Sequence, residues 1–444
     1  MHGLRLALDV ESGTLHVLDE PAYFAVTQLA SGFNNDAVSV MLGQKFNQQV
    51  ACEVLAEIDR QRQKGQLFSK PKVIDTAKDV VVKALCLHLA HDCNLRCRYC
   101  FAGSGSYGGN RSLMTPEVAK KSVDFLIEMS GKRRHCEIDF FGGEPLLNFN
   151  ALMETVNYGR RKEKELGKVL KFTVTTNAFN FPDKMQEYLN REDISVVLSL
   201  DGRQEVHDSM RKQPGGGGSY DTVLENCKRL VSSRDGDNYY LRGTYTRKNL
   251  DFSNDVLAMI SEGFKSLSLE PAVLTPGKEE TLRIEDLPYL EAEYEKLVSI
   301  LWEMEEEGNR IHFFHFELDL EKGPCVKKRA SGCGAGMAYL AVAPDGSLFP
   351  CHQFVGMSEF YAGHVDKGLE IENLAQFQNV GINAKKECKE CFARFFCGGG
   401  CHASAWMING SLLQPYALGC SLHRKRVECG LYLQARRLLI NMGR

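Results

Sequence analysis

The sequence lacks the features that mark membrane-spanning, secreted and nucleic-acid-binding chains. No apolar run reaches the roughly 18 residues that cross a bilayer. The N-terminus lacks the basic and apolar regions of a signal peptide. The net charge of -3 at pH 7 provides no basic excess for binding nucleic acid. We therefore expect a cytoplasmic protein with no membrane and no nucleic-acid partner.

Cysteine, by contrast, is abundant. The chain has 444 residues, enough for two or three domains, and 16 of them are cysteines. A reducing compartment argues against a disulfide framework, so metal binding is the remaining explanation for this number. Five cysteines stand alone in helix-like or strand-like patterns, and we expect them to be small buried hydrophobic residues. These five are Cys52, Cys86, Cys136, Cys227 and Cys429.

The segment around which the chain is organised is Cys93–Cys100, with the sequence CNLRCRYC. Thiolates are soft ligands for zinc or iron-sulfur clusters, and this tight spacing lets one loop present three of them to one centre. No fourth ligand lies nearby in the sequence, so we expect an open position at which a substrate or cofactor binds the metal. A zinc knuckle is the purely structural alternative.

The first 78 residues predict a small unit made of a hairpin and three helices. The hairpin strands are expected over 4–10 and 14–18, and the helices over 21–30, 35–42 (ending at Gly43) and 47–64. Acidic residues offset the basic ones on these helices, so DNA binding is disfavoured. A winged-helix-like unit that captures an extended peptide along an exposed strand edge fits better. Residues 69–78 are expected to form a linker.

Residues 79–310 alternate between strand and helix patterns, as in a parallel sheet covered by helices. The strands are expected over 80–90, 136–141, 171–176, 194–200, 239–246 and 266–269, and a long helix follows over 285–307. Six strands are too few for a closed eight-stranded barrel. The predicted fold class is therefore α/β, with an open, partial (β/α)6 barrel whose chemistry lies at the carboxyl ends of its strands.

Unusual residues follow successive strands of this barrel. The cysteine loop follows the first strand, Gly142–Pro145 (GGEP) the second, Thr175–Asn177 the third and Ser199–Gly202 the fourth, with Arg211 close behind. Two glycines let the backbone approach a ligand closely, and Glu144 supplies an anion for an amino group. Each motif alone is weak, since a GGEP is more often a turn. Together they predict one ligand site at this edge of the sheet.

Cysteines gather again in residues 311–444. The eight are Cys325, Cys333, Cys351, Cys388, Cys391, Cys397, Cys401 and Cys420. Cys401 lies four residues beyond Cys397, so on a turn these two thiols can face different centres. Two zinc sites remain an alternative to iron-sulfur clusters, because the spacing of four thiolates does not distinguish the metals.

The spacing C-x-x-x-C-x-aromatic-C resembles the signature of radical S-adenosylmethionine (radical SAM) enzymes. The cysteines from Cys333 onward, with Gly346 five residues before Cys351, resemble the SPASM extension of that family. The resemblance implies three 4Fe-4S clusters, with Cys325 either a further ligand of the inner cluster or a loop thiol that leaves one iron open. The implied ligands are Cys93, Cys97 and Cys100 (catalytic), Cys333, Cys351 and Cys401 (inner auxiliary), and Cys388, Cys391, Cys397 and Cys420 (outer auxiliary).

The same resemblance implies how SAM is held. Tyr99 would pack against the adenine, Gly143 and Glu144 would hold the methionyl amine, Ser199 the ribose and Arg211 the carboxylate. One electron then cleaves SAM to give a 5'-deoxyadenosyl radical, which removes a hydrogen atom from the substrate.

The layout resembles that of anaerobic sulfatase-maturating enzymes, which oxidise a serine or cysteine in a protein chain. Two departures argue against that activity. His352 and Gln353 follow Cys351, where those enzymes carry an aspartate base. The second departure is the N-terminal unit, which those enzymes lack and which resembles the leader-recognition element of enzymes that mature ribosomally made peptides.

Taken together, the three parts resemble maturases that form thioethers between a cysteine sulfur and a backbone carbon. The opening MHGLRLALDVESGTLHVLDEPAYFAV is most similar to the SCIFF maturases, which act on a six-cysteine peptide of clostridia. The implied partners are a cysteine-rich precursor peptide with a leader and an electron donor such as ferredoxin or flavodoxin, in an anaerobic bacterium. Alternatives are a carbon-carbon cross-link, sulfatase-type oxidation, or a zinc-stabilised peptide-binding regulator, which would leave the GGEP and Ser199–Arg211 motifs unexplained.

Overall fold

A computed structural model describes residues 3–71, 80–320, 330–441 and 443. Cys325 and all of the expected linker beyond residue 71 lie outside the described residues.

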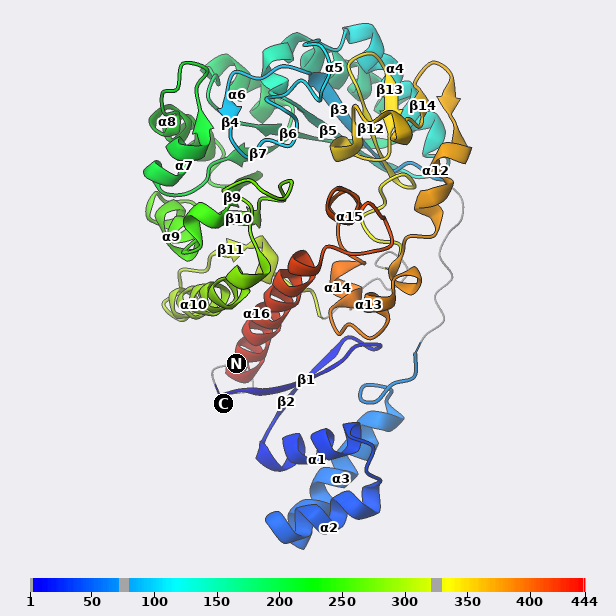
Figure 1. The fold of residues 1–444 in the computed structure, drawn as a ribbon, viewed down its shortest axis with the longest axis vertical. Coiled ribbons are helices and arrows are strands. Elements are labelled where there is room, and N and C mark those ends of the chain that lie inside the picture. Colours follow the sequence, from blue (N-terminus) through cyan, green and yellow to red (C-terminus); the bar gives the residue numbers. More distant parts are fainter. Residues whose placement is uncertain (1–2, 72–79, 321–329, 442, 444) are drawn as a thin grey trace.

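The N-terminal unit is a hairpin followed by three helices, which confirms the prediction for these elements (Figure 1). The antiparallel strands are β1 (Arg5–Asp9) and β2 (Thr14–Leu18), and the helices are α1 (Glu20–Ala30), α2 (Asn35–Lys45) and α3 (Gln48–Gln63). Each helix begins after an Asp or Asn whose side chain accepts a hydrogen bond from a backbone N–H of the first turn. The expected end of α2 at Gly43 is wrong. A Cβ on Gly43 would lie 2.7 Å from Gln48 Oε1, so glycine serves the close approach of α3.

Six parallel strands form the centre of the protein, as predicted. They are β3 (Ala84–Ala90), β5 (His135–Gly142), β6 (Val169–Thr176), β7 (Ser195–Ser199), β9 (Tyr239–Tyr245) and β10 (Ser266–Pro271), and they pair in the order β3-β5-β6-β7-β9-β10. The helices between and after them are α4 (Pro116–Met129), α5 (Phe149–Leu166), α6 (Asp183–Arg191), α7 (Gln204–Met210), α8 (Tyr220–Ser232), α9 (Ser253–Ser261) and α10 (Leu287–Glu306). Figure 1 shows the larger helices along the outside of the curved sheet. The carboxyl ends of all six strands therefore meet on one side of the sheet.

The sheet continues beyond these six strands to a total of eleven. At one edge β11 (His312–Phe313) runs parallel to β10; at the other β12 (Tyr339–Val342) runs parallel to β3 and is followed by antiparallel β13 (Ser347–Phe349), β14 (Gly363–His364) and β15 (Gly368–Leu369). These strands have two to four residues, too few to show a hydrophobic period in the sequence. One sheet thus spans residue 310, where the sequence suggested a domain boundary.

The remaining C-terminal helices lie beside the open side of the sheet (Figure 1). They are α12 (Ile371–Gln378), α13 (Lys386–Lys389), α14 (Arg394–Cys397), α15 (His402–Asn409) and α16 (Ala417–Asn441). The hairpin β1-β2 packs against this region, because Leu8 and Leu15 join a small apolar cluster with Val427 and Leu431 of α16.

Four of the five isolated cysteines are buried, as expected, namely Cys86, Cys136, Cys227 and Cys429. The expectation for Cys52 is wrong, because this residue is exposed on α3. Its immediate neighbour Ala51 is buried instead. The helical pattern around position 52 therefore places the apolar stripe one residue earlier than the cysteine.

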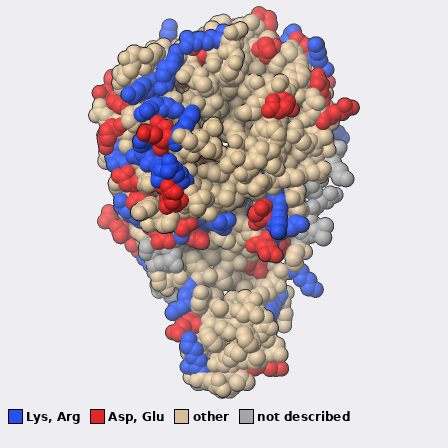
Figure 2. Space-filling model, viewed as in Figure 1, with Lys and Arg blue, Asp and Glu red and all other residues tan. Residues whose placement is uncertain are grey.

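The distribution of charged side chains on the surface is consistent with the small net charge of the chain. On the face drawn in Figure 2, Lys and Arg side chains lie interspersed with Asp and Glu. Among the described residues, no helix combines the length and apolar character needed to cross a membrane.

Arg426 of α16 fastens this helix to the barrel. Its Nη1 lies 3.0 Å from Glu270 Oε2 on β10, and its Nε donates to the Tyr294 hydroxyl at 2.8 Å. Burial opposes the charge of this guanidinium, but Tyr294 and Glu270 stabilise it and raise its pKa overall. Removing one partner from a buried charged pair leaves the other uncompensated.

We predict that Arg426→Ala lowers the free energy of unfolding by about 3–5 kcal/mol, measured by urea denaturation. Arg436→Ala is the control on the same helix. Arg436 pairs with Glu306 at the surface, so its loss should cost only about 0–1 kcal/mol. Equal effects of the two substitutions would contradict the role given to Arg426.

Candidate active site

A cavity of about 470 Å³ lies at the carboxyl ends of the barrel strands. Of the residues predicted to act in catalysis, Cys93, Cys97, Tyr99, Cys100, Gly143, Ser199 and Arg211 line it. The wall is completed by Tyr339 and His352 from the part of the chain after residue 311. The structure thus brings together side chains that the sequence separates by more than 200 positions.

Two contacts fix the cysteine loop over this cavity. Two residues of the loop form β4 (Arg96–Cys97), which pairs antiparallel with β8 (Arg211–Lys212), so that Cys97 lies opposite Arg211. From the end of β6, Asn177 Nδ2 donates to Asn94 Oδ1 at 2.8 Å and lies 3.6 Å from Cys93 Sγ. Residues that follow the third and fourth strands therefore position the loop that follows the first.

Asp201 organises the side of the cavity near Arg211. This fully buried carboxylate accepts hydrogen bonds from the Tyr99 hydroxyl at 2.5 Å, Arg211 Nε at 3.0 Å and Thr244 N at 2.9 Å. The guanidinium of Arg211 also lies 5.4 Å from the centre of the Tyr99 ring. Asp201 thus holds both Tyr99, the predicted adenine contact, and Arg211, the predicted carboxylate contact. The sequence analysis included Asp201 only as part of the Ser199–Gly202 motif.

Glu144 differs from the other predicted contacts, since only 2% of it is exposed and it lies behind the cavity wall. It accepts hydrogen bonds from Thr176 Oγ1 (2.8 Å), Asn177 N (2.8 Å) and Leu146 N (3.0 Å). Burial raises the pKa of its carboxyl to about 7 despite these bonds. A carboxylate has about four acceptor positions, so one remains for a further donor.

The three thiols of the loop are partly buried and close enough to influence one another. Burial, then the charge of Glu144, raises the pKa of Cys93 to about 12, and Cys97 and Cys100 add to the effect. Burial likewise raises the pKa of Cys97 to about 11. These sulfurs hold their protons at neutral pH unless a cation replaces them, as a metal does.

Two C-terminal thiols, Cys351 and Cys420, have different cysteine neighbours. Burial and then Cys401 and Cys333 raise the pKa of Cys351 to about 12. Burial and then Cys397 and Cys388 raise the pKa of Cys420 to about 11, with Cys391 also contributing. We call Cys333, Cys351 and Cys401 the inner group and Cys388, Cys391, Cys397 and Cys420 the outer group; their role as cluster ligands stays a prediction.

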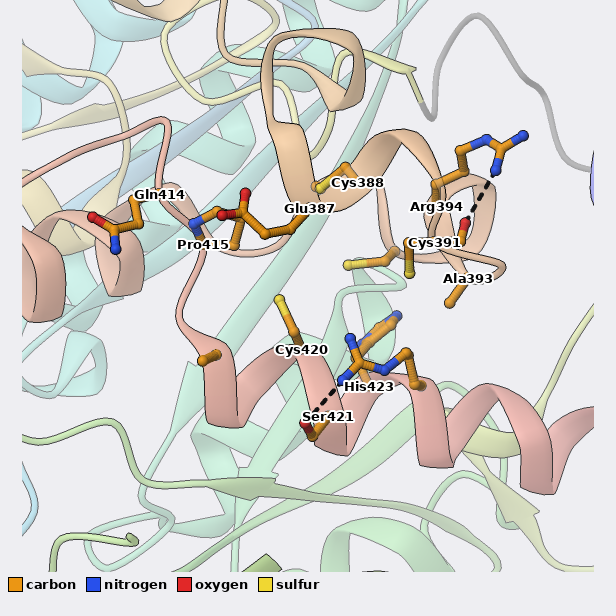
Figure 3. A pocket seen from close by; sticks show the side chains of 14 residues that line it. Glu387, Cys388, Cys391, Ala393, Arg394, Gln414, Pro415, Cys420, Ser421 and His423 are labelled. Carbon is orange, nitrogen blue, oxygen red and sulfur yellow. Dashed lines mark hydrogen bonds between the residues drawn. The ribbon is translucent and has the colours of Figure 1, made fainter. Parts of the chain in front are cut away.

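The outer group surrounds a cavity of its own, about 320 Å³ in volume. Figure 3 shows Cys388 and Cys391 descending from the segment of α13 and α14 toward Cys420 on α16. Cys397 lines the same space, and His423 and Arg424 of α16 close it from the side.

Among the described residues, no three or more Cys, His, Asp or Glu side chains meet the geometric requirement for binding one metal ion. Thiolates are ligands of both zinc and iron-sulfur clusters, so the donor set by itself suits either kind of centre.

Several residues of the cavity were not singled out from the sequence. Asp139 of β5 and Tyr339 of β12 both line it. Two other lining residues, Arg242 and His352, were noted in the sequence, Arg242 as a charge in the fifth strand and His352 as the residue after Cys351. The Tyr339 hydroxyl lies 3.2 Å from His352 Nδ1. The available signal for Asp139 was a second acidic residue, two positions after Glu137, in a central strand.

Gly143 is required by the backbone packing around the cysteine loop. A Cβ at this position would lie 2.1 Å from the Asp92 carbonyl oxygen and 3.0 Å from Gly105 Cα.

We predict that Gly143→Ala forces the loop away and lowers stability by roughly 1–3 kcal/mol, measured by thermal unfolding of the metal-free protein. Gly109→Ala is the control, because its Cβ would meet no atom closer than 3.6 Å. An unchanged melting temperature for Gly143→Ala would refute this explanation.

Comparison with known families and sequences agrees with this geometry. Residues 87–251 match the model of the radical SAM superfamily. The chain is 31% identical to an uncharacterized protein of Methanocaldococcus jannaschii over 50% of its own length and 71% of that protein. It is 23% identical to the radical SAM cyclopropyl synthase TigE of Paramaledivibacter caminithermalis (77% and 72% covered) and 26% identical to a cysteine-type anaerobic sulfatase-maturating enzyme of Clostridium perfringens (70% and 85% covered).

Two further similarities concern peptide biosynthesis and fold. The chain is 29% identical to the subtilosin biosynthesis protein AlbA of Bacillus subtilis, covering 62% of this chain and 56% of AlbA. Among solved structures, native anSMEcpe with bound AdoMet superposes with a TM-score of 0.68 at 20% identity, over 81% of this chain and 99% of that one. Streptococcus suis SuiB bound to S-adenosylmethionine gives 0.55 at 14%, over 94% and 99%. The predicted α/β radical SAM fold is confirmed, and residues 87–251 are a domain of the radical SAM superfamily.

Proposed function

We propose that the protein modifies a ribosomally made, cysteine-rich precursor peptide by forming intramolecular thioethers between cysteine sulfur and backbone carbon. The observation that carries this proposal is the position of Cys93, Cys97 and Cys100 in the wall of the barrel cavity, in a chain that also has C-terminal cysteine groups and an N-terminal hairpin unit. We further propose three functional parts: residues 1–78 for leader recognition, 79–310 for radical chemistry and 311–444 for two auxiliary clusters.

The residues of the cavity suit a catalytic 4Fe-4S cluster on Cys93, Cys97 and Cys100 with SAM beside it. When bound, this pair supplies a 5'-deoxyadenosyl radical that removes a hydrogen atom from the substrate. Tyr99, Ser199 and Arg211 on the cavity wall, with Gly143 and the free acceptor position of Glu144, would orient SAM. Asp201 holds Tyr99 and Arg211 in place, so it preorganises two of these contacts at once.

The inner and outer cysteine groups have different access to the cavity. His352 and Gln353, which follow Cys351, line the cavity, and so does Ser404, three residues after Cys401. The outer group opens instead onto its separate cavity. We infer that the inner and outer groups would each hold an iron-sulfur cluster, and that such clusters would supply a route for electrons between the cavity and a protein such as ferredoxin or flavodoxin.

The hairpin unit offers a groove for the leader of the precursor. This groove of about 370 Å³ runs along residues 7–11, the end of β1 and the start of the turn after it, and is closed by Val26 and Ala30 of α1 and by Leu67. Strand β1 pairs only with β2 within the part of the chain that the structure describes, so its other edge can receive an extended segment. Leader binding would raise the effective concentration of the core peptide at the barrel.

Two other modifications are compatible with a radical SAM peptide-modifying enzyme. Sulfatase-type oxidation is disfavoured, because His352 occupies the position after Cys351 and burial lowers its pKa to about 4, leaving a neutral side chain in place of a carboxylate. A bond between two carbons is the second candidate, and the similarity to TigE, named a cyclopropyl synthase, favours it. A thioether consumes one thiol for each link, whereas a carbon-carbon bond consumes none.

We predict the product of anaerobic incubation with SAM, a reductant and the cysteine-rich peptide encoded beside this protein. Each cross-link should lower the peptide mass by two hydrogens, remove one thiol that alkylating reagents can trap, and release one 5'-deoxyadenosine. Mass spectrometry after alkylation measures all three quantities. Loss of two hydrogens with every thiol still reactive would support carbon-carbon bond formation instead.

We also predict the iron content of three multiple alanine variants after anaerobic reconstitution. Replacing Cys93, Cys97 and Cys100 together, or the inner group, or the outer group, should each remove about four irons per chain, since each group suits one four-iron cluster. The exposed Cys52→Ala should remove none. If either C-terminal variant retained the full iron content, that group would not be a cluster site.

A further inference from the structure

The barrel cavity contains a carboxyl group, that of Asp139, to which the proposed function assigns no role. Asp139 lies on β5 on the same face as Glu137 and Phe141, and it lines the cavity together with the three catalytic thiols. Across the sheet it is in register with Cys86 of β3 on one side and Thr173 of β6 on the other. It is therefore a fixed acid on a rigid central strand.

The surroundings of Asp139 bring the pKa of its carboxyl closer to neutral pH. Burial and then Glu137 raise its pKa to about 6, against the opposing effects of Lys83 and of a hydrogen bond from Thr173. Lys83 pairs with Glu137 at 3.2 Å. The other titratable groups that face Asp139 or share the cavity with it are Cys86, Cys93, Cys97, Tyr99, Cys100, Arg211, Arg242, Glu270, Tyr339 and His352. Glu270 is neutralised by Arg426, and His352 is neutral.

Thioether formation releases a proton that needs an acceptor. The substrate begins as a thiol and a C–H bond, and it ends with one S–C bond. The hydrogen atom of the C–H bond leaves with the adenosyl radical, one electron leaves to an iron-sulfur acceptor, and the thiol hydrogen leaves as H⁺. A cysteine thiol has an ordinary pKa of about 8.5, so only a small fraction is thiolate at neutral pH.

Resting on the proposed function, we propose that Asp139 is the base that takes the proton from the substrate thiol. Its carboxylate accepts H⁺ and becomes the acid, while the sulfur becomes the thiolate that forms the S–C bond. A base raised toward the pKa of its proton donor transfers the proton with less free-energy cost than an ordinary aspartate.

Asp139→Asn tests the proposal, because it keeps the size of the side chain and removes the base. With the wild-type holoenzyme and full-length precursor, cross-linked peptide per 5'-deoxyadenosine should rise with pH through an inflection near the pKa of Asp139. In Asp139→Asn this ratio should fall by about 100-fold or more, because radical formation continues without deprotonation. Infrared difference titration of the metal-free proteins should show one raised carboxyl pKa in wild type that the variant lacks.

Two neighbouring substitutions should move the inflection in opposite directions. Glu137→Gln removes a nearby negative charge from the same strand face, so the inflection should shift to lower pH. Thr173→Val removes a hydrogen bond to the carboxylate, so it should shift to higher pH. Both variants keep Asp139, and both should still form product. A purely structural role for Asp139 would produce neither shift.

The outcomes separate this proposal from the proposed function. If wild type forms thioethers and Asp139→Asn does so with the same ratio and pH dependence, Asp139 is not the base and the proposed function stands. An inflection that Glu137→Gln and Thr173→Val leave unmoved also overturns the role of Asp139. If wild type forms no thioether with its precursor, the proposed function fails, and the role of Asp139 fails with it.

Discussion

The structure depends on the pairing of the cysteine loop with the end of the fourth strand-helix unit. Cys97 and Arg211 lie opposite each other in the β4-β8 ladder, Arg98 N donates to the Met210 carbonyl beside them at 2.9 Å, and the buried Asp201 ties Arg211 to Tyr99 in the same loop. Because the ladder and the carboxylate connect the same two segments, neither segment can move alone. This double connection places three thiols, an aromatic ring and a guanidinium around one cavity before any ligand binds, and preorganised groups lose little freedom on binding.

Burial governs the chemistry of the cysteines. Where the pKa of a cysteine thiol departs from its ordinary value, the pKa is raised, chiefly because burial removes water from the charged thiolate. The folded protein therefore stores protonated thiols in three groups, and a metal centre must replace those protons to bind. Since ligand deprotonation and folding are coupled in such sites, the metal contributes to stability as well as reactivity.

The sequence predicted the six-stranded barrel because apolar strands alternate with amphipathic helices, which is a strong local signal. The grouping of the C-terminal cysteines was implied by the family resemblance and stays a prediction. The sequence could not predict that β12 joins β3, since four residues carry no period and the partner is more than 200 positions away. For the same reason it missed Asp139 and Tyr339, which become neighbours only through strand register. Exposure of Cys52 was missed because Ala51 and Val54, on either side of it, are apolar.

The hairpin and the outer cysteine loop depend on each other physically. Val10, next to β1, packs on the apolar cluster that contains Cys388, and the neighbouring Glu11 forms a largely buried ion pair with Arg394. Arg394 lines both the outer cysteine cavity and the groove along β1. If the outer loop lost its order, Val10 would lose its apolar cover and Glu11 its cation, and each loss carries a free-energy cost. The position of the hairpin relative to the barrel is consequently set by the outer loop and α16, at the opposite end of the sequence.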